Sequence, residues 1–493
     1  MGLDHTRAPF YEALLAEKNF APLSFHMPGH KFKAGLLPDL TTWLGADWAA
    51  VDVNECSPTV DYLHAPGPAL RDAQALAADL AGADATYFLV NGATVGNQAM
   101  LLATAHDGQK VIVSRASHRS VYAGLILSGA RPVYVPASVH PATGLPLAVS
   151  TAAIAAALQA NPEAVAVQIT GINYYGYLPD VPALVALAHA HDVPLLVDEA
   201  HGAHLGLHPL LPRSAVQHGA DLVVQSPHKT LGALTQAAWL HVVGDRVARP
   251  ALAQALALLQ SSSPSVLLTG SLDVVRRRMA LDGSRLLGRV VALAARARDS
   301  IRAIPGLDCY GPELIGDAQG IAAHDPSKLV IDVRASELTG TQLQARLRDQ
   351  SRLGVEFADP GHVVCSITAA DDDETVDALL EALRRAVVGS REAQSGAIEI
   401  GDLPPIPAMA LTPRQAFGAP TTVVKLEDAI GRVCAEQVMP YPPGIPLLLP
   451  GEVVGAEHVD YLRGQLAHGV RLVGPEDPGL RTLRVIINVE QGA

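Results

Sequence analysis

Residues 194–202 read PLLVDEAHG, a short apolar run that ends in a carboxylate and is followed by a glycine. The run predicts a buried β-strand over 194–197 with Asp198 at its carboxyl end. A second apolar run, 221–225, is followed by the turn SPHKT, which contains Lys229. Lys229 lies 31 residues after Asp198, which is room for one helical crossover between neighbouring parallel strands. The two runs therefore predict a parallel sheet with Asp198 and Lys229 at the same edge.

The chain on both sides of this pair alternates between short apolar runs and helical patterns. This alternation is typical of an α/β domain with a mostly parallel sheet, in which functional groups gather at the carboxyl ends of the strands. Helices are expected over 69–80, 98–105 and 181–191, and a long helix over about 276–303. Strands are expected over 86–90, 111–113, 131–135, 164–170, 194–197, 221–225 and 237–243.

Shifts in composition divide the 493 residues into five segments. Residues 1–70 are expected to be largely irregular, with a short amphipathic start followed by Gly- and Pro-rich sequence over 24–68. A large domain follows over 71–290, and a smaller α/β domain over 291–390. Residues 391–412, rich in Gly, Pro and Ala, read as a linker, and 413–493 as a C-terminal domain.

The formal net charge of −13 argues against nucleic acid as a partner, because phosphate binding relies on clustered Lys and Arg. The first ten residues contain no apolar signal-peptide core, and no run of about 18 apolar residues predicts a membrane span. The four cysteines show no Cys-x-x-Cys spacing, so neither a metal site nor a disulfide framework is indicated. We expect a cytoplasmic protein with no membrane partner.

Asp198 and Lys229 together suit pyridoxal phosphate (PLP), which needs an amine for a Schiff base and a carboxylate opposite its ring nitrogen. A buried carboxylate is costly without a cationic partner, and a protonated pyridine supplies one. Two other interpretations stay open. Lys229 on its own reads as a solvated loop lysine, and Asp198 with His201 and His204 reads as a metal site.

A phosphate cradle and a ring-stacking group are also present in the sequence. The Gly-containing turn 91–97 opens a helix, where backbone N–H groups and the hydroxyl of Thr94 suit a phosphate. The alternative is that Thr94 only caps the helix. His118 follows the strand predicted at 111–113 and could stack on the ring, although a histidine in a turn is usually just solvated.

At this point the chain resembles the ornithine/lysine/arginine decarboxylase family in its fold-type-I, aspartate-aminotransferase-like form. It is similar to the short members that lack an N-terminal receiver-like domain. The resemblance spans nearly the whole chain and rests on matching stretches at 24–31, 88–92, 117–122, 127–130, 198–204, 226–231, 262–265 and 440–446.

The resemblance implies residue roles at the matching positions only. Lys229 is implied as the Schiff-base lysine, Asp198 as the partner of the ring nitrogen and His118 as the stacking group. Further cofactor contacts are implied for Ala93, Thr94, Ser226, His228, Ala200, His201, Ser262 and Ser263. Ser262 and Ser263 are expected to reach the phosphate in a neighbouring subunit, which implies a homodimer with shared active sites or a higher oligomer. Relatives often carry Ser or Thr where this chain has Ala93, so one side-chain contact to the phosphate is expected to be missing.

The implied reaction is loss of CO₂ from a basic amino acid, with Lys229 or His228 returning a proton to Cα. We expect arginine, giving agmatine, ahead of lysine, giving cadaverine, and ornithine, giving putrescine. A cationic side chain needs an acidic pocket. Candidate substrate-binding residues are Glu356, Asp359, Glu452 and His30. An aminotransferase or lyase, and a non-catalytic PLP-binding regulator, are the remaining alternatives.

Overall fold

A computed structural model describes residues 3–57, 59–137, 139–316, 320–387, 403–441, 444–467 and 470–487. The chain divides into two compact units, residues 1–103 with 196–287 and residues 104–195 with 288–493. Residues 391–402 of the expected linker lie outside the described residues. The five-segment division made from the sequence stays a prediction.

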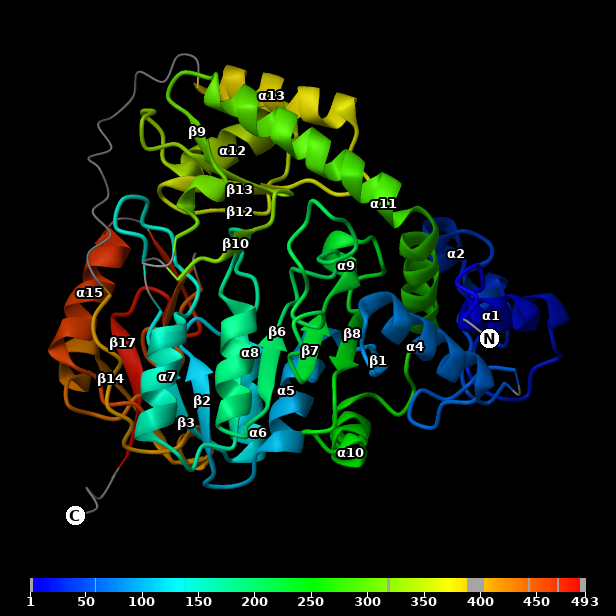
Figure 1. Cartoon of the computed structure of the whole chain (residues 1–493), viewed down its shortest axis with the longest axis horizontal. Helices are drawn as coiled ribbons and strands as arrows, with labels where there is room; N and C mark the ends of the chain where they lie inside the picture. Colours follow the sequence, from blue (N-terminus) through cyan, green and yellow to red (C-terminus); the bar gives the residue numbers. More distant parts are fainter. Residues whose placement is uncertain are drawn as a thin grey trace. The chain divides into compact units, whose positions relative to one another are not determined.

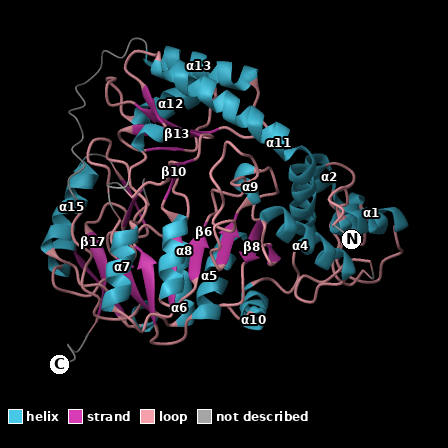
Figure 2. Cartoon of the chain, in the orientation of Figure 1, coloured by secondary structure: helices cyan, strands magenta, loops and turns pink. Residues whose placement is uncertain are grey.

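Seven strands form one sheet in the order β1-β8-β7-β6-β4-β2-β3. Strands are magenta in Figure 2, where β6 and β8 of this sheet are labelled. β6 pairs with β7, and β2 pairs with both β3 and β4, in parallel registers. β8 runs antiparallel to both of its neighbours, β1 and β7. The sheet is therefore mostly parallel, as predicted.

The first unit consists of the N-terminal helices and one group of strands (Figure 1). Pro9 and Pro38 stand at the starts of α1 and α2, where the missing N–H of proline costs nothing. Its elements are α1 (Pro9–Phe20), η1 (Ala34–Leu36), α2 (Pro38–Leu44), α3 (Trp48–Val51), α4 (Pro68–Ala81), β1 (Ala85–Leu89), α5 (Gly92–Thr104), β6 (Leu195–Asp198), β7 (Leu222–Gln225), α9 (Pro227–Thr230), β8 (Ala238–Val242), α10 (Arg249–Leu259) and the start of α11 (Val266–Arg302).

Strand direction in this unit brings three strand ends to one edge. Because β1 and β7 are each antiparallel to β8, they run the same way, and β6 is parallel to β7. The chain leaves β1 into α5, leaves β6 at Asp198 and leaves β7 into α9. The predicted phosphate turn, Asp198 and Lys229 therefore follow strand ends on the same side of the sheet.

The second unit begins with three strands of the sheet and continues into a smaller domain with an antiparallel sheet, β12-β13-β11-β9. Its apolar core includes Ile301, Leu329, Ile331 and Val363, all fully buried. The elements up to this point are β2 (Lys110–Ser114), α6 (Arg119–Ser128), β3 (Arg131–Val135), α7 (Thr151–Ala160), β4 (Ala166–Thr170), β5 (Tyr177–Leu178), α8 (Val181–Ala190), β9 (Asp308–Tyr310), η2 (Pro312–Leu314), β10 (Ala323–His324), β11 (Lys328–Asp332), α12 (Gly340–Ser351), β12 (Phe357–Ala358), β13 (His362–Ser366) and α13 (Asp373–Val387).

The C-terminal part of the second unit packs around a core of its own, which includes Cys434, Leu448, Leu462 and Val485. Two small antiparallel sheets, β14 with β17 and β15 with β16, surround this core. Its elements are α14 (Pro413–Gly418), β14 (Thr421–Lys425), η4 (Leu426–Ala429), β15 (Met439–Tyr441), α15 (Ala456–Ala467), β16 (Arg471–Val473) and β17 (Thr482–Ile486).

Two helices begin earlier than expected, and one was not expected at all. α5 starts at Gly92 instead of residue 98, so the predicted phosphate turn is the first part of the helix itself. α11 starts at Val266, ten residues before the expected position. The expectation that the first 70 residues are largely irregular missed α1. Among the described residues, no helix combines the length and the apolar character needed to cross a membrane.

Candidate active site

Asp198 ends β6 and is buried, with 5% of its surface exposed. Its Oδ2 accepts a hydrogen bond of 2.7 Å from Nδ2 of Asn97, and its Oδ1 accepts one of 3.1 Å from the backbone N–H of Ala200. Both oxygens are therefore held in fixed directions by neutral donors. Neutral donors do not compensate the charge of a carboxylate, so a cationic partner suits this position.

Lys229 lies on the short helix α9, directly after β7. Asp198 is opposite Val224 in the parallel register, so the two predicted residues follow neighbouring parallel strands, as expected. Nζ of Lys229 lies 3.0 Å from Nε2 of His201, a residue of the turn that follows Asp198. His201 is thus placed to exchange a proton with the lysine amine.

A buried hydrogen-bond network joins the ends of β6 and β7. The side-chain amide of Gln225 donates to Glu199 over 2.6 Å, and Ser214 donates to the same carboxylate oxygen over 2.6 Å. Burial raises the pKa of Glu199. Because Glu199 follows Asp198 and Gln225 precedes Ser226, this network fixes the spacing between the two strand ends that carry the site.

The network continues from Gln225 to the neighbouring strands through His241 of β8. Nε2 of His241 lies 3.1 Å from the side-chain oxygen of Gln225, and its Nδ1 lies 2.8 Å from the hydroxyl of Thr86 in β1. Burial lowers the pKa of His241 to about 3. The imidazole is therefore neutral at physiological pH and acts as a buried spacer between strands.

The expected phosphate site combines a helix start with a buried hydroxyl. Gly92 adopts a positive φ of 68°, and its N–H donates to the carbonyl of Gln236 over 2.8 Å. The next N–H groups, of Ala93 and Thr94, belong to the first turn of α5, where a helix has no internal acceptors. Oγ of Ser226 is buried and has no hydrogen-bond partner in the described part of the chain. These donors fit a phosphate dianion, and Asp198 fits a protonated ring nitrogen, so the residues present suit PLP.

His228 precedes Lys229 and is half-buried. Its Nδ1 lies 2.9 Å from the carbonyl oxygen of Ala237. A carbonyl only accepts, so Nδ1 carries the proton and Nε2 is an acceptor while the ring is neutral. Burial lowers the pKa of His228, which favours this neutral form. A contact between Nε2 and a phosphate would require the ring to take up a proton.

His118 belongs to the second unit and caps the start of α6. Its Nδ1 accepts from the backbone N–H of Ser120 over 3.3 Å and lies 2.8 Å from the hydroxyl of the same residue. The cap fixes the ring orientation and leaves Nε2 as the protonated nitrogen of the neutral ring.

Two of the predicted substrate-binding carboxylates have partners within the second unit. Glu356 pairs with Nζ of Lys328 at 2.7 Å. Asp359 accepts from the hydroxyl of Tyr175 over 2.8 Å, and one of its oxygens lies 2.9 Å from Nδ1 of His362. Each partner already compensates part of the negative charge that a substrate cation would use.

The other two predicted substrate-binding residues are also engaged. Glu452 forms a buried ion pair with Arg115. His30 lies in the first unit, where its Nε2 is 3.3 Å from Asp52 and its ring contacts Trp48. Their role in binding the substrate side chain stays a prediction.

Ser262 and Ser263 lie on an exposed turn between α10 and α11. The N–H of Ser263 donates to the hydroxyl of Ser261 over 3.1 Å, and the carbonyl of Ser261 lies 2.8 Å from Nε2 of His64. The turn is thus held by its own chain, while both predicted side chains face outward.

No group of three metal-ligating side chains lies together within the described ranges, so nothing in them supports the metal interpretation of Asp198, His201 and His204.

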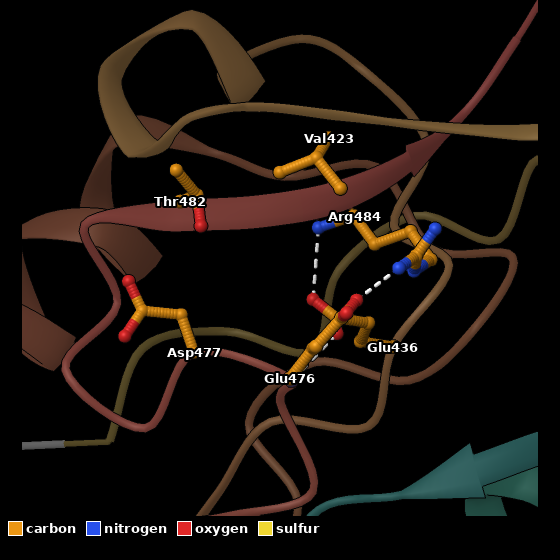
Figure 3. Close-up of a pocket in the computed structure, with 6 residues that line it drawn as sticks. All are labelled: Val423, Glu436, Glu476, Asp477, Thr482 and Arg484. Carbon is orange, nitrogen blue, oxygen red and sulfur yellow. Dashed lines mark hydrogen bonds and ion pairs between the residues drawn. The ribbon is translucent and has the colours of Figure 1, made fainter.

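A pocket in the C-terminal part is lined by Val423, Glu436, Glu476, Asp477, Thr482 and Arg484 (Figure 3). Glu436 accepts from the backbone N–H groups of Glu476 and Arg484, each over 2.8 Å, and Glu476 pairs with the guanidinium of Arg484. The lining of this pocket contains none of the predicted catalytic residues.

Sequence reasoning missed Asn97 as the partner of Asp198, and it missed Gln225 and His241 altogether. Asn97 was visible only as the last residue of the phosphate turn. The one available signal was a polar residue among the mostly apolar positions that α5 buries. Nothing in the sequence indicates that Gln225 bridges two strand ends.

The chain is similar to known proteins in both sequence and fold. The family described as "Orn/Lys/Arg decarboxylase, major domain" matches residues 8–371, and its C-terminal domain matches residues 402–474. Arginine decarboxylase of Halalkalibacterium halodurans is 37% identical over 97% of this chain and 98% of its own length. Arginine decarboxylase of Bacillus subtilis is 37% identical over 97% of each chain. The structure of Francisella novicida lysine decarboxylase superposes with a TM-score of 0.85 at 20% identity, covering 97% of this chain and 81% of that one.

Proposed function

This chain belongs to the Orn/Lys/Arg decarboxylase family, and we propose that it converts arginine to agmatine and CO₂. Membership makes it a PLP-dependent decarboxylase of a basic amino acid with a fold-type-I architecture. The choice of arginine rests on one observation: relatives named arginine decarboxylase share 37% of their residues with this chain over nearly its full length.

When bound, PLP accepts the electron pair that the departing carboxylate leaves on Cα. The role proposed for Asp198 is to keep the ring nitrogen protonated. Asn97 and the N–H of Ala200 hold its two oxygens, so the carboxylate does not have to reorient during the reaction. The negative charge of Asp198 is thus placed before the reaction begins.

Lys229 is the proposed attachment residue and the proposed donor of the proton that returns to Cα. Its amine is 3.0 Å from His201, which can hold the proton while the lysine is neutral. His228 is the weaker candidate for proton donor. Its Nδ1 proton is directed at the carbonyl of Ala237, and its Nε2 has no proton to give while the ring is neutral.

The remaining cofactor contacts are proposed from their local geometry. Ser226, with its unpartnered buried hydroxyl, and the first turn of α5 at Ala93 and Thr94 would hold the phosphate. His118, with its ring fixed as a helix cap, would pack on the cofactor ring.

We propose a homodimer in which the turn at Ser262 and Ser263 serves the site of the second subunit. The N-terminal segment of the first unit supports this assembly, because it presents large apolar side chains to solvent. Phe20, Leu23, Phe25 and Trp43 are 74%, 82%, 89% and 78% exposed. Large apolar side chains exposed at several positions of one segment favour a protein interface there. Sedimentation of the holoenzyme tests the dimer, and a monomer at micromolar concentration would contradict it.

We propose a cytoplasmic location because the cysteines are free thiols. All four cysteines are free, and Cys309, Cys365 and Cys434 are buried. Free thiols in a chain of this length are typical of a reducing compartment. Cell fractionation with an antibody to the protein tests this assignment.

The activity is tested by incubating the purified holoenzyme separately with arginine, lysine and ornithine and identifying the products by mass spectrometry. We expect agmatine with the largest kcat/KM, and no product from the Lys229→Ala variant. Cadaverine or putrescine as the main product would overturn the choice of arginine. Formation of a keto acid without CO₂ would overturn decarboxylation itself.

A further inference from the structure

Arg115 is a buried arginine, 3% exposed, at the point where β2 leads into the turn that carries His118. Its Nε donates to the carbonyl of Pro446 over 2.9 Å, and its Nη2 donates to the carbonyl of Leu447 over 3.0 Å. The guanidinium also forms a two-pronged pair with Glu452, with 2.8 Å between Nη2 and Oε2. All four acceptors lie between residues 446 and 452, in the C-terminal part of the chain.

Glu452 is held as firmly as the arginine. It is 1% exposed, and its Oε2 also accepts from the N–H of Leu449 over 2.8 Å. Gly451 before it adopts a φ of +98°, and a Cβ at this position would lie 2.2 Å from the carbonyl oxygen of Leu411. The carboxylate therefore projects from a tightly built turn and has little freedom to release Arg115.

The opposite charges of Arg115 and Glu452 compensate each other. Burial lowers the pKa of Arg115, the hydrogen-bonded carboxylate of Glu452 raises it, and the net change is a rise. The ring of Tyr134 lies 4.8 Å from the guanidinium and adds a cation–π contact. Removing the charge of Glu452 would leave a buried cation with carbonyl acceptors only.

The turn after Arg115 is tied down at each residue. The hydroxyl of Tyr122 donates to the carbonyl of Arg115 over 2.8 Å, and Thr170 donates to the carbonyl of Ala116 over 3.2 Å. Ser117 donates to the carbonyl of Ser114 over 2.7 Å and also contacts Gln168. Because these hydrogen bonds hold the turn between Arg115 and His118, the position of Arg115 constrains the position of His118, the cap of α6.

The C-terminal part also holds the far end of the same helix. Arg414 of α14 donates to the carbonyl of Ile126 over 2.9 Å and pairs with Asp107 at 3.1 Å. Both ends of α6 are thus anchored by residues of the C-terminal part: Arg115 near its first residue is held by Glu452, and Ile126 near its last is held by Arg414.

We propose that Glu452 is a positioning residue: through Arg115 it holds the turn 115–118 and so fixes the orientation of His118, the residue proposed to pack on the cofactor ring. The inference rests on the proposed role of His118. It gives the C-terminal part of the chain a positioning role, which differs from the substrate binding expected of Glu452 from the sequence.

The Glu452→Gln variant tests this proposal, because glutamine preserves the shape and removes the charge. In the full-length holoenzyme we expect amide exchange over 115–122 to become at least about tenfold faster. The visible circular dichroism of bound PLP should weaken. We expect kcat to fall about tenfold while KM for arginine changes less than about twofold, because the substrate is not touched.

Asp273→Asn is the matched control. Asp273 forms an equally buried pair with Arg276 at 2.8 Å and accepts from the N–H of Phe10 over 2.9 Å. We expect this variant to lose thermal stability as Glu452→Gln does, with unchanged exchange over 115–122 and unchanged dichroism. If Glu452→Gln fails to fold, the Arg115→Met/Glu452→Met double variant removes both charges. It should recover stability while keeping the dichroism defect.

A His118→Ala variant distinguishes the proposed role of His118 from the proposed role of Glu452. If His118→Ala alters the dichroism and Glu452→Gln (or the double variant) leaves dichroism, exchange and kcat as in the wild type, the positioning role of Glu452 is overturned. If His118→Ala leaves PLP affinity and dichroism unchanged, the proposed role of His118 fails, and the inference fails with it. A rise in KM for arginine at constant kcat in Glu452→Gln would also overturn it, because that result indicates substrate binding.

Discussion

Asn97 donates a hydrogen bond of 2.7 Å to Asp198 although the two residues lie 101 positions apart in the chain. The bond joins the second turn of α5 to the end of β6, so the helix that begins at the expected phosphate site also orients the expected partner of the ring nitrogen. One helix therefore begins at one proposed cofactor contact and orients a second one, Asp198.

Replacing Asn97 with alanine should lower kcat by about tenfold to a hundredfold. A hydrogen bond to a buried charged group is worth about 1.5–3 kcal/mol, and its loss lets the carboxylate turn away from the ring nitrogen. Steady-state kinetics with arginine measures the effect. Asn97→Asp should be worse than Asn97→Ala, because it places a second negative charge beside Asp198, and the reverse order would contradict the role of Asn97 as a donor.

Replacing Asp198 with asparagine should reduce kcat by about three powers of ten. Asparagine has nearly the same shape and one oxygen that can still accept a hydrogen bond, so the loss reports the charge. Single-turnover measurement of CO₂ release checks this value. Near-normal release from a correctly folded Asp198→Asn enzyme would rule out Asp198 as the group that keeps the ring protonated.

The Ser226→Ala variant should bind PLP about tenfold more weakly without any loss of stability in the cofactor-free protein. Oγ of Ser226 is buried but has no protein partner within the described ranges. The substitution therefore removes a proposed hydrogen bond to the phosphate and none to the protein. Spectroscopic titration with PLP and thermal melting of the apoprotein measure the two quantities.

Ser214→Ala provides the comparison for that experiment. Its hydroxyl donates to the buried Glu199 over 2.6 Å, so the apoprotein should melt about 2–4 °C lower. Equal melting losses in the Ser226→Ala and Ser214→Ala apoproteins would contradict the assignment of Ser226 to the phosphate.

His241 should make stability depend on pH. Its folded pKa of about 3 lies below its ordinary value of 6.5, so the unfolded chain binds one more proton between these limits. Stability is complete above about pH 6.5 and falls by about 1.4 kcal/mol per pH unit as the pH decreases towards 3. Glu199, whose pKa burial raises, contributes a slope of opposite sign to both proteins.

Denaturant unfolding at several pH values, with the wild type compared with His241→Gln, isolates the imidazole. We expect the variant to lose less stability between pH 6.5 and 4.5, because glutamine takes up no proton there. Parallel pH profiles for the two proteins would show that His241 already binds a proton in the folded state.

The positions of Asp198 and Lys229 could be predicted because each follows a short apolar strand, and strand ends are local features of sequence. The network behind them could not. Gln225, Glu199 and His241 are brought together by pairing between β6, β7 and β8, and no local pattern specifies which buried polar groups will meet.

The start of α5 was predicted too late because Gly92 and Gly96 argue against a helix. The structure shows why Gly96 is there: a Cβ would lie 2.4 Å from Cγ2 of Val224, so the glycine lets the helix approach β7 closely. Glu452 shows that a partner distant in the sequence cannot be predicted from local pattern. An acidic residue suggested a substrate cation, and no local pattern indicates its ion pair with Arg115, which lies 337 positions away in the sequence.

Borohydride reduction of the holoenzyme, followed by digestion and mass spectrometry of the peptides, tests the attachment of the cofactor most directly. Reduction makes the bond between PLP and its lysine permanent, so the modified residue is identified without reference to activity. We predict a single modified peptide that carries PLP on Lys229, and none in the Lys229→Ala variant. PLP on another lysine, or a holoenzyme that reduction leaves unmodified, would contradict the account.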